Sequence, residues 1–242
     1  MAEHRQAARR RRGPPGSPLV RGAGGVAQHE TRAAALAQQS FDTWLYGLPW
    51  TSTTSDHPLP EEELRRRSRK STIAEERLST WYPDVSGIAL PYGAPVCQRE
   101  NLSWDSRLRR RYATALTIAV ATWIAIGVVI GIVGDLSVRD LIIRWFVPSS
   151  AMLLLAAQQA RGHREIATEK EPLAAKVRAE LDVADNTPPS PAEEVRLWQQ
   201  CRMIQDGLLR ARKRGERVLR WLFERYRDLD ELDMRETEAP WV

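Results

Sequence analysis

One segment of the chain has the length and composition of a membrane-spanning helix. From Ala113 to Val133 the sequence runs for 21 residues, ATALTIAVATWIAIGVVIGIV, without a charged residue or a proline. At about 1.5 Å of rise per residue, such a helix extends roughly 30 Å, the thickness of a hydrocarbon core. The rest of the chain is polar, because the overall mean hydropathy is −0.44 and 28% of the residues are charged. We therefore predict a membrane protein with most of its mass in water.

A second apolar run, LIIRWFVPSSAMLLLAA, covers Leu141 to Ala157 after a short loop. Arg144 lies one turn from its start and can reach back to the membrane interface. Pro148 removes one helical hydrogen bond, which a packed membrane helix tolerates. The alternative is a buried hairpin of a soluble protein, which the first run disfavours because it has no polar face.

The cations that flank the two runs predict the orientation, because positively charged flanks stay on the cytoplasmic side. The connecting loop carries only Arg139, with Asp135 and Asp140 beside it. We therefore expect both termini in the cytoplasm, and we expect no signal peptide because no apolar stretch follows the basic N-terminus. The flanking residues are Arg107, Arg109, Arg110 and Arg111 before the first run, and Arg161, His163 and Arg164 after the second.

The predicted fold class is an all-α membrane protein with two transmembrane helices, 113–133 and 141–157, and a cytoplasmic helical domain. Residues 1–28 are rich in Arg, Gly and Pro and predict a disordered tail. Residues 29–112 form a partly helical cytoplasmic segment, with one helix ending near Leu45 and another that runs from near Val96 into the first span. Residues 158–238 form a second cytoplasmic helical region with a linker at 186–191.

The last predicted helix, about Ala192 to Met234, carries an apolar heptad seam. Basic residues crowd its other faces, and they are either solvated or in contact with anionic headgroups or a negatively charged ligand. The seam residues are Leu197, Cys201, Ile204, Leu208, Ala211, Gly215, Val218 and Leu222, and the basic residues are Arg210, Arg212, Lys213, Arg214, Arg217 and Arg220.

No enzyme motif is present: there is no P-loop, GxSxG, HExxH or paired CxxC. The four histidines are scattered, and Cys97 and Cys201 are expected to be free thiols with no metal-site spacing. We therefore expect no catalysis, no cofactor and no metal. The net charge of +5 favours an anionic ligand or an anionic membrane surface.

Cations and flat aromatic rings are mixed just before the first span. Arginine forks match phosphate oxygens and rings stack on bases, so this mixture predicts an oligonucleotide site. In the alternative, the rings pack the cytoplasmic domain and the arginines set the topology. The candidate ligand-binding residues are Trp81, Tyr82, Arg99, Asn101, Trp104 and Arg107.

Within the first span, Gly127 and Gly131 form a GxxxG pattern. Missing side chains allow two helix backbones to approach closely, which predicts a membrane helix contact and a homo-oligomer. The alternative is a helix that is merely rich in small residues.

Four stretches, FDTWLYGLPW, WYP, CQRENLSWDSRLRRRYA and RMIQDGLLRARKRG, resemble the SMODS-associated four-transmembrane effectors over residues 32 to 238. These are pore-forming effectors of bacterial anti-phage systems. The resemblance implies that a partner nucleotidyltransferase makes a cyclic oligonucleotide, which the effector binds before it oligomerises and disrupts the bacterial inner membrane. The infected cell then dies or stops growing (abortive infection). It implies no DNA or RNA polymer as a partner.

Family members carry two spans upstream of the segment that matches Phe41 to Trp50, and this sequence has none there. We therefore expect the chain as written to form pores weakly. Two other functions stay open: a membrane-anchored adaptor that holds a protein partner on the Leu197 to Leu222 seam, and a holin-like protein that needs no ligand.

Overall fold

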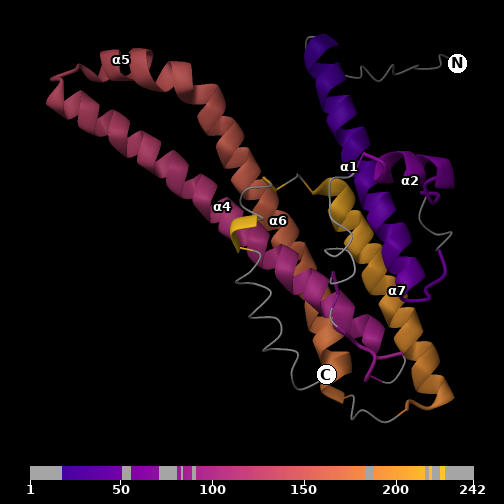
Figure 1. Ribbon diagram of the computed structural model, residues 1–242. Helices are drawn as coiled ribbons and strands as arrows, with labels where there is room; N and C mark the ends of the chain where they lie inside the picture. Colours follow the sequence, from indigo (N-terminus) through magenta and orange to yellow (C-terminus); the bar gives the residue numbers. More distant parts are fainter. Residues whose placement is uncertain are drawn as a thin grey trace, which may run out of the picture.

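The computed structural model describes residues 18–50, 56–70, 81–82, 84–88, 91–183, 188–215, 218–219 and 224–226. Every regular element in these ranges is helical. Two long antiparallel helices form a hairpin, and the other helices gather at the end of the hairpin that lies opposite its turn (Figure 1). Both arms of the hairpin are long and apolar enough to cross a membrane. The predicted fold class is therefore confirmed.

Helix α4, Gly93–Val133, joins the helical domain to the first span without a break. Its N-terminal half is buried, with Leu102 at 0% and Leu108 at 2% exposure. Its C-terminal half is apolar and exposed, with Ile132 at 75% exposure. Exposed apolar surface on this scale is unfavourable in water, so the two halves belong to different solvents. The helix begins three residues before the expected Val96.

The return arm contains α5 (Val138–Leu141), a π-helical turn η1 (Ile142–Phe146) and α6 (Val147–Val183). The second span is therefore not one regular helix as expected. At the end of the π turn, the N–H of Val147 donates to the carbonyl of Ile142, five residues earlier. This widened turn directly precedes Pro148, whose ring would clash with a carbonyl four residues back in a regular helix. Arg144 is exposed and forms an ion pair with Asp140 at 3.4 Å.

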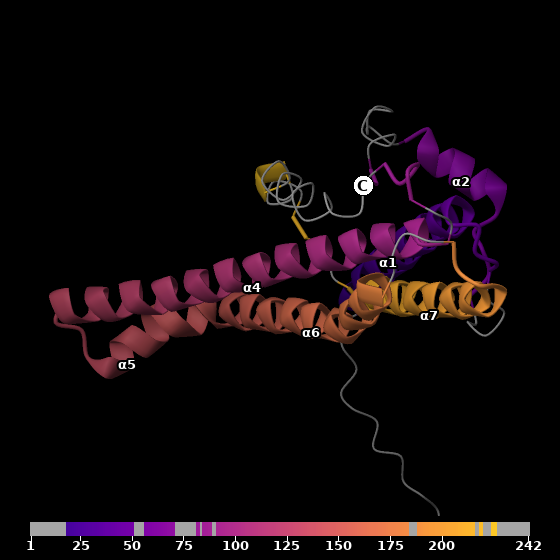
Figure 2. The ribbon, with the colours of Figure 1, turned by 90° about the horizontal axis from the view of Figure 1, so that it is seen from below.

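Helices α1 (Pro18–Leu45) and α7 (Pro191–Arg214) lie side by side next to the buried end of the hairpin (Figures 1 and 2). The start of α1 differs from the sequence expectation, because residues 18–28 are helical here rather than part of a disordered tail. A proline in the first turn has no N–H to leave unpaired, so Pro18 suits a helix start, although the three glycines that follow favour a helix only weakly. Residues 1–17 lie outside the described ranges.

Helix α7 begins as expected and ends earlier than expected. Ser190 and Glu193 form a capping box at its start, and Pro191 is its first residue. Gly215 adopts an extended conformation, so the helix stops at Arg214 instead of continuing to Met234. The Arg109 guanidinium packs against this glycine, since a Cβ there would lie 2.9 Å from Arg109 Nη2. Among the described residues that follow Gly215, the helical ones are residues 224–226.

The main core lies where α4, α6 and α7 meet. The heptad seam of α7 is buried in this core and in the contacts with α1, so the chain itself covers it. An adaptor that used this seam for a protein partner would have to unpack its own domain. The core residues are Val96 and Leu102 from α4, Val177 and Leu181 from α6, Ile204 and Leu208 from α7, and Ile88 from the preceding loop.

The outer face of the domain carries the short helix α2 (Glu61–Ser68), which has no buried residue. Arg67 pairs with Glu30 of α1 at 2.8 Å and so attaches α2 to the domain. The remainder of the charged segment predicted as helical, residues 71–78, lies outside the described ranges.

Candidate functional site

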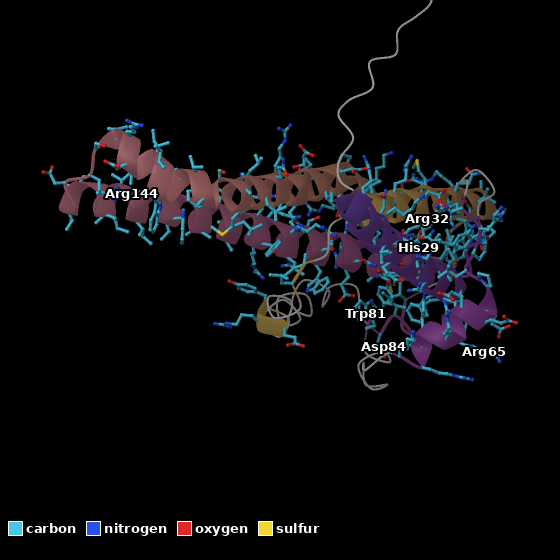
Figure 3. All side chains as sticks on the ribbon, turned by 90° about the horizontal axis from the view of Figure 1, so that it is seen from above. His29, Arg32, Arg65, Trp81, Asp84 and Arg144 are labelled. Carbon is cyan, nitrogen blue, oxygen red and sulfur yellow. The ribbon has the colours of Figure 1, made fainter. Side chains whose placement is uncertain are left out.

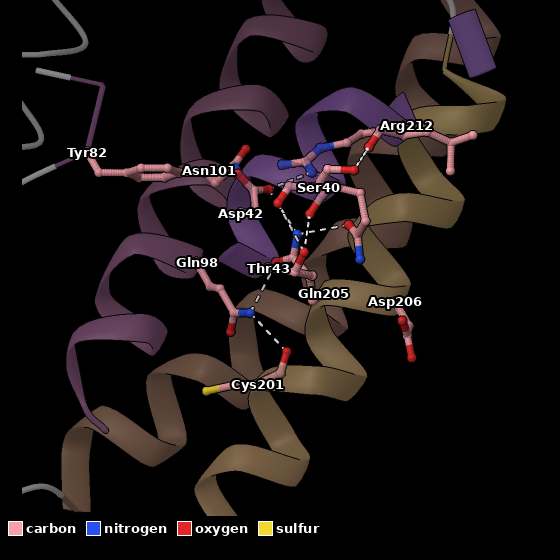
Figure 4. A network of polar contacts seen from close by, with 12 residues as sticks. Ser40, Asp42, Thr43, Tyr82, Gln98, Asn101, Cys201, Gln205, Asp206 and Arg212 are labelled. Atoms are coloured by element: carbon pink, nitrogen blue, oxygen red, sulfur yellow. Dashed lines mark hydrogen bonds and ion pairs between the residues drawn. The ribbon is translucent and has the colours of Figure 1, made fainter. Parts of the chain in front are cut away.

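A buried carboxylate, Asp42, is the centre of a polar network between α1, α4 and α7 (Figure 4). Its side chain is fully buried and accepts three hydrogen bonds: from Tyr82 Oη at 2.7 Å, from Gln205 Nε2 at 2.9 Å and from Arg212 Nη1 at 2.7 Å. A buried charge is tolerated when it is paired and hydrogen-bonded, as it is here. Asp42 therefore joins α1 to α7 and to the loop that carries Tyr82.

A chain of glutamine amides extends this network into α4. Gln205 Nε2 also donates to Gln39 Oε1 at 2.9 Å. Gln98 Nε2 donates to Gln205 Oε1 at 3.2 Å and to the carbonyl of Cys201 at 2.9 Å. All three glutamine side chains are almost completely buried. Burying an amide costs free energy unless the amide is hydrogen-bonded. This series of glutamine hydrogen bonds therefore specifies the register of α1, α4 and α7.

The solvent edge of the network is aromatic. The rings of Phe41 and Tyr82 are nearly parallel, with 8° between their planes and 6.3 Å between their centroids. Trp44 lies one turn further along α1, 6.4 Å from Phe41. Tyr46 meets Tyr82 edge-on at 5.7 Å. Burial and the charge of Asp42 raise the pKa of Tyr82, so its hydroxyl remains a donor at neutral pH.

The structure brings together two of the six residues that the sequence proposes as ligand-binding. Asn101 Nδ2 donates to Tyr82 Oη at 3.0 Å, beside Asp42. Arg99 is two residues before Asn101 on α4, which turns its side chain about 200° away from Asn101. Its Nη2 atom is buried and has no hydrogen-bond partner within the described part of the chain.

Of the remaining candidates, Trp104 and Arg107 lie further along α4 than Asn101. Trp104 packs with the buried pair Leu108 and Tyr112, nearer the membrane. Arg107 is half-buried on α4. Trp81 directly precedes Tyr82, is half-buried, and lies in the domain well away from Arg144 of the second span (Figure 3). The hydrogen bonds therefore join Tyr82 to Asn101, and a ligand-binding role for the other four residues stays a prediction.

Sequence reasoning missed Phe41, Asp42 and Gln205 as site residues, and it named Arg212 only as one of the basic residues of the last helix, either solvated or in contact with an anion. Asp42 and Gln205 are 163 positions apart, and no local pattern predicts such a contact. A signal was present, because Phe41 and Asp42 lie in FDTWLYGLPW and Gln205 and Arg212 lie in RMIQDGLLRARKRG. Both stretches carry the family resemblance, and the structure places them in contact.

The basic face of α7 is largely paired within the chain. Arg212 pairs with Asp42, Lys213 with Asp56, and Arg214 with Glu169. Hydrogen bonds from Lys213 and Arg32 hold the pKa of Asp56 below its usual value. These three cations of α7 therefore stabilise the fold through ion pairs. Arg217 and Arg220 lie outside the described ranges.

A second charged cluster lies where α4 and α6 leave the domain for the membrane. Asp105 accepts a hydrogen bond from Arg109 Nε at 2.6 Å and pairs with the buried Lys170 of α6. Arg109 Nη1 also lies 3.2 Å from Nδ1 of His163, whose ring meets Tyr112 edge-on. We call these four residues, Asp105, Arg109, His163 and Lys170, the exit cluster.

The exit cluster has defined protonation states. Burial raises the pKa of Asp105, but Lys170 and Arg109 outweigh it and hold that pKa well below its usual range. Burial and the neighbouring Arg109 lower the pKa of His163 to about 4, so the imidazole is neutral at physiological pH. Burial lowers the pKa of Lys170 and Asp105 opposes that shift, so Asp105 is the anion on which both Lys170 and Arg109 depend.

The two glycines of the first span face the second span of the same chain. A Cβ on Gly127 would lie 2.4 Å from Trp145 Nε1, and one on Gly131 would lie 3.0 Å from Leu141. Trp145 also stacks on Trp123, with 4.7 Å between ring centroids. The GxxxG surface is therefore filled within the hairpin, while a contact between chains at these glycines stays a prediction.

Comparison with known proteins identifies similar sequences. The profile of the family described as the SMODS-associating 4TM effector domain matches residues 21–239. A probable CBASS effector molecule of Bacillus cereus is 23% identical over 190 residues. That match covers 78% of this chain and 62% of the relative, so the chain spans less than two thirds of that protein's length. No solved structure matches.

Proposed function

Since the chain belongs to the SMODS-associating 4TM effector family, we propose that it acts as the membrane effector of a bacterial anti-phage system and is gated by a cyclic oligonucleotide. Family membership indicates a membrane protein with a role as a defence effector. A partner synthase would make the messenger, and the domain formed by α1, α4 and α7 would bind it. The effector would then assemble with further copies and disrupt the inner membrane.

One structural observation supports gating more than any other: α4 belongs to both the polar network and the membrane hairpin. Gln98 lies in the network, and the same helix continues through the exit cluster into the span 113–133. A ligand that altered the packing of α1 and α7 on the first turns of α4 would tilt or shift the span as a rigid lever. The ligand can do so only through a difference in affinity between the resting and the assembled states.

We also propose that both termini are cytoplasmic and that the loop between the spans faces the periplasm. The basic residues flanking the hairpin support this orientation. A periplasm-active reporter inserted at Ser137 should be active, and the same reporter fused after Val242 should be silent. Activity of the C-terminal fusion would reverse the topology.

The function itself can be tested in vesicles that contain the full chain. We expect a cyclic oligonucleotide from the cognate synthase to increase chemically cross-linked oligomers severalfold. Release of an enclosed dye should follow the same concentration dependence. A linear oligonucleotide of the same composition serves as the control.

Two results would count against this function. Equal cross-linking with and without the messenger would contradict gating. Dye release that needs no messenger would favour the ligand-independent, holin-like function. No covalent chemistry is required in either case, so the assay needs no substrate turnover.

A further inference from the structure

Three aromatic side chains form a surface that the fold does not need as core. We call Phe41, Trp44 and Tyr82 the aromatic platform. Trp44 is 77% exposed and Phe41 is 40% exposed, although both are large apolar residues on α1. The two belong to the last turns of α1, at the end of the molecule away from the α5 turn (Figures 1 and 2). Their exposure is therefore not explained by contact with the bilayer core.

The platform is held rigidly from behind. Tyr82 donates to the buried Asp42 and accepts from Asn101, so its ring cannot turn freely (Figure 4). Phe41 is parallel to that ring within 8°. A surface that is already ordered loses little conformational entropy when a flat ligand stacks on it. Rigidity combined with exposure is typical of a binding surface rather than of a packing defect.

A cation, Arg212, lies behind the platform on the far side of Asp42, and its charge suits a negatively charged ligand (Figure 4). Arg212 reaches Asp42 from the side opposite Tyr82, and its Nη1 donates to that carboxylate (Figure 4). Its Nη2 has no hydrogen-bond partner among the residues that the structure describes, although the side chain is only 9% exposed. An unpaired cationic donor is costly where it is buried, and a phosphate oxygen is the acceptor that matches it best.

From this arrangement we propose that the aromatic platform stacks on a nucleobase of the cyclic oligonucleotide, and that a phosphate of this ligand reaches the buried Arg212 Nη2 by displacing the side chains that cover it. The inference rests on the proposed function and gives it a location. Every nucleobase presents a flat face, so stacking provides affinity for the ligand class, and hydrogen bonds at the base edges would select among bases. Of the residues first considered from the sequence, Tyr82 and Asn101 belong to this site.

The test uses the purified full chain in detergent and isothermal titration with four probes: cyclic di-AMP, cyclic di-GMP, cyclic GMP–AMP and cyclic tri-AMP. Trp44→Leu and Phe41→Leu should each weaken the binding of the recognised probe about tenfold, the typical loss for one stacked ring. Phe41→Tyr keeps a ring and should bind almost as well as the wild type. Trp198→Leu, a half-buried tryptophan outside the platform, is the matched control. Circular dichroism should show unchanged helix content in every variant.

The possible failures are distinguishable. If the wild type binds a probe and both leucine variants bind it equally well, the platform is not the site, while the proposed function stands. If the wild type binds neither the four probes nor the product of the cognate synthase, gating by this ligand class fails and the platform fails with it.

Discussion

Replacing Asp105 with asparagine is expected to cost about 3–5 kcal/mol of folding free energy, the loss typical when one partner of a buried ion pair is removed. Asp105 is the single carboxylate of the exit cluster, and it holds both Arg109 and the buried Lys170. Without its charge, two cations would face each other in a place largely shielded from water. Chemical denaturation of the protein in detergent, followed by circular dichroism, measures the loss.

The matched variant Lys170→Met should be far milder. It removes a buried cation, but Asp105 keeps its hydrogen bond from Arg109 at 2.6 Å. Because the desolvation cost of Lys170 also disappears, the net change is expected within about 1 kcal/mol. Equal losses in the two variants would show that the exit cluster is held by packing rather than by charge.

The exit cluster also lies on the path between the proposed ligand site and the membrane. It joins α4 to α6 at the point where both helices leave the domain. We expect an intact cluster to make the two arms of the hairpin move together, because it pairs Asp105 of α4 with Lys170 of α6. We therefore expect Lys170→Met, which should fold, to be the informative variant for coupling between ligand binding and assembly.

Replacing Gly127 with valine is expected to separate the two spans. Even a single Cβ at this position would lie 2.4 Å from Trp145 Nε1 and 2.5 Å from Cδ1, well inside van der Waals contact. The indole is flat and is stacked on Trp123, so it cannot move aside without losing that contact. Overpacking of this kind costs about 1–3 kcal/mol, which should lower the melting temperature in detergent by several degrees.

Two companion variants isolate the cause. Adding Trp145→Leu to Gly127→Val should restore most of the lost stability, because the smaller side chain makes room for the valine. Gly162→Ala in α6 meets no atom within 4 Å and should stabilise the helix by about 0.5–1 kcal/mol. A Gly127→Val protein as stable as the wild type would exclude the close approach of the spans at this position.

The membrane hairpin could be predicted from the sequence because its signal is local. A run of 21 uncharged residues needs no partner to indicate a span, and its flanking arginines indicate a side of the membrane. The seam of α7 was also predictable, because its period is that of a helix and it is buried as far as Ala211. The surface that packs against this seam was not predictable, because the period alone does not say whether the buried face meets another protein or the same chain.

The candidate site depended on contacts that only the tertiary structure decides. Nearness in sequence suggested one surface for Arg99 and Asn101, yet helix geometry turns them to different sides of α4. The GxxxG pattern likewise predicted a close contact without naming Trp145 as the residue that fills it.

What the sequence by itself determined is where the chain meets lipid, because transfer into a bilayer depends on the composition of one continuous segment. Only the tertiary structure decided that Asp42 would accept hydrogen bonds from Tyr82 and Arg212. A buried charge must find its partners wherever the packing of distant helices brings them, and no local pattern records that choice.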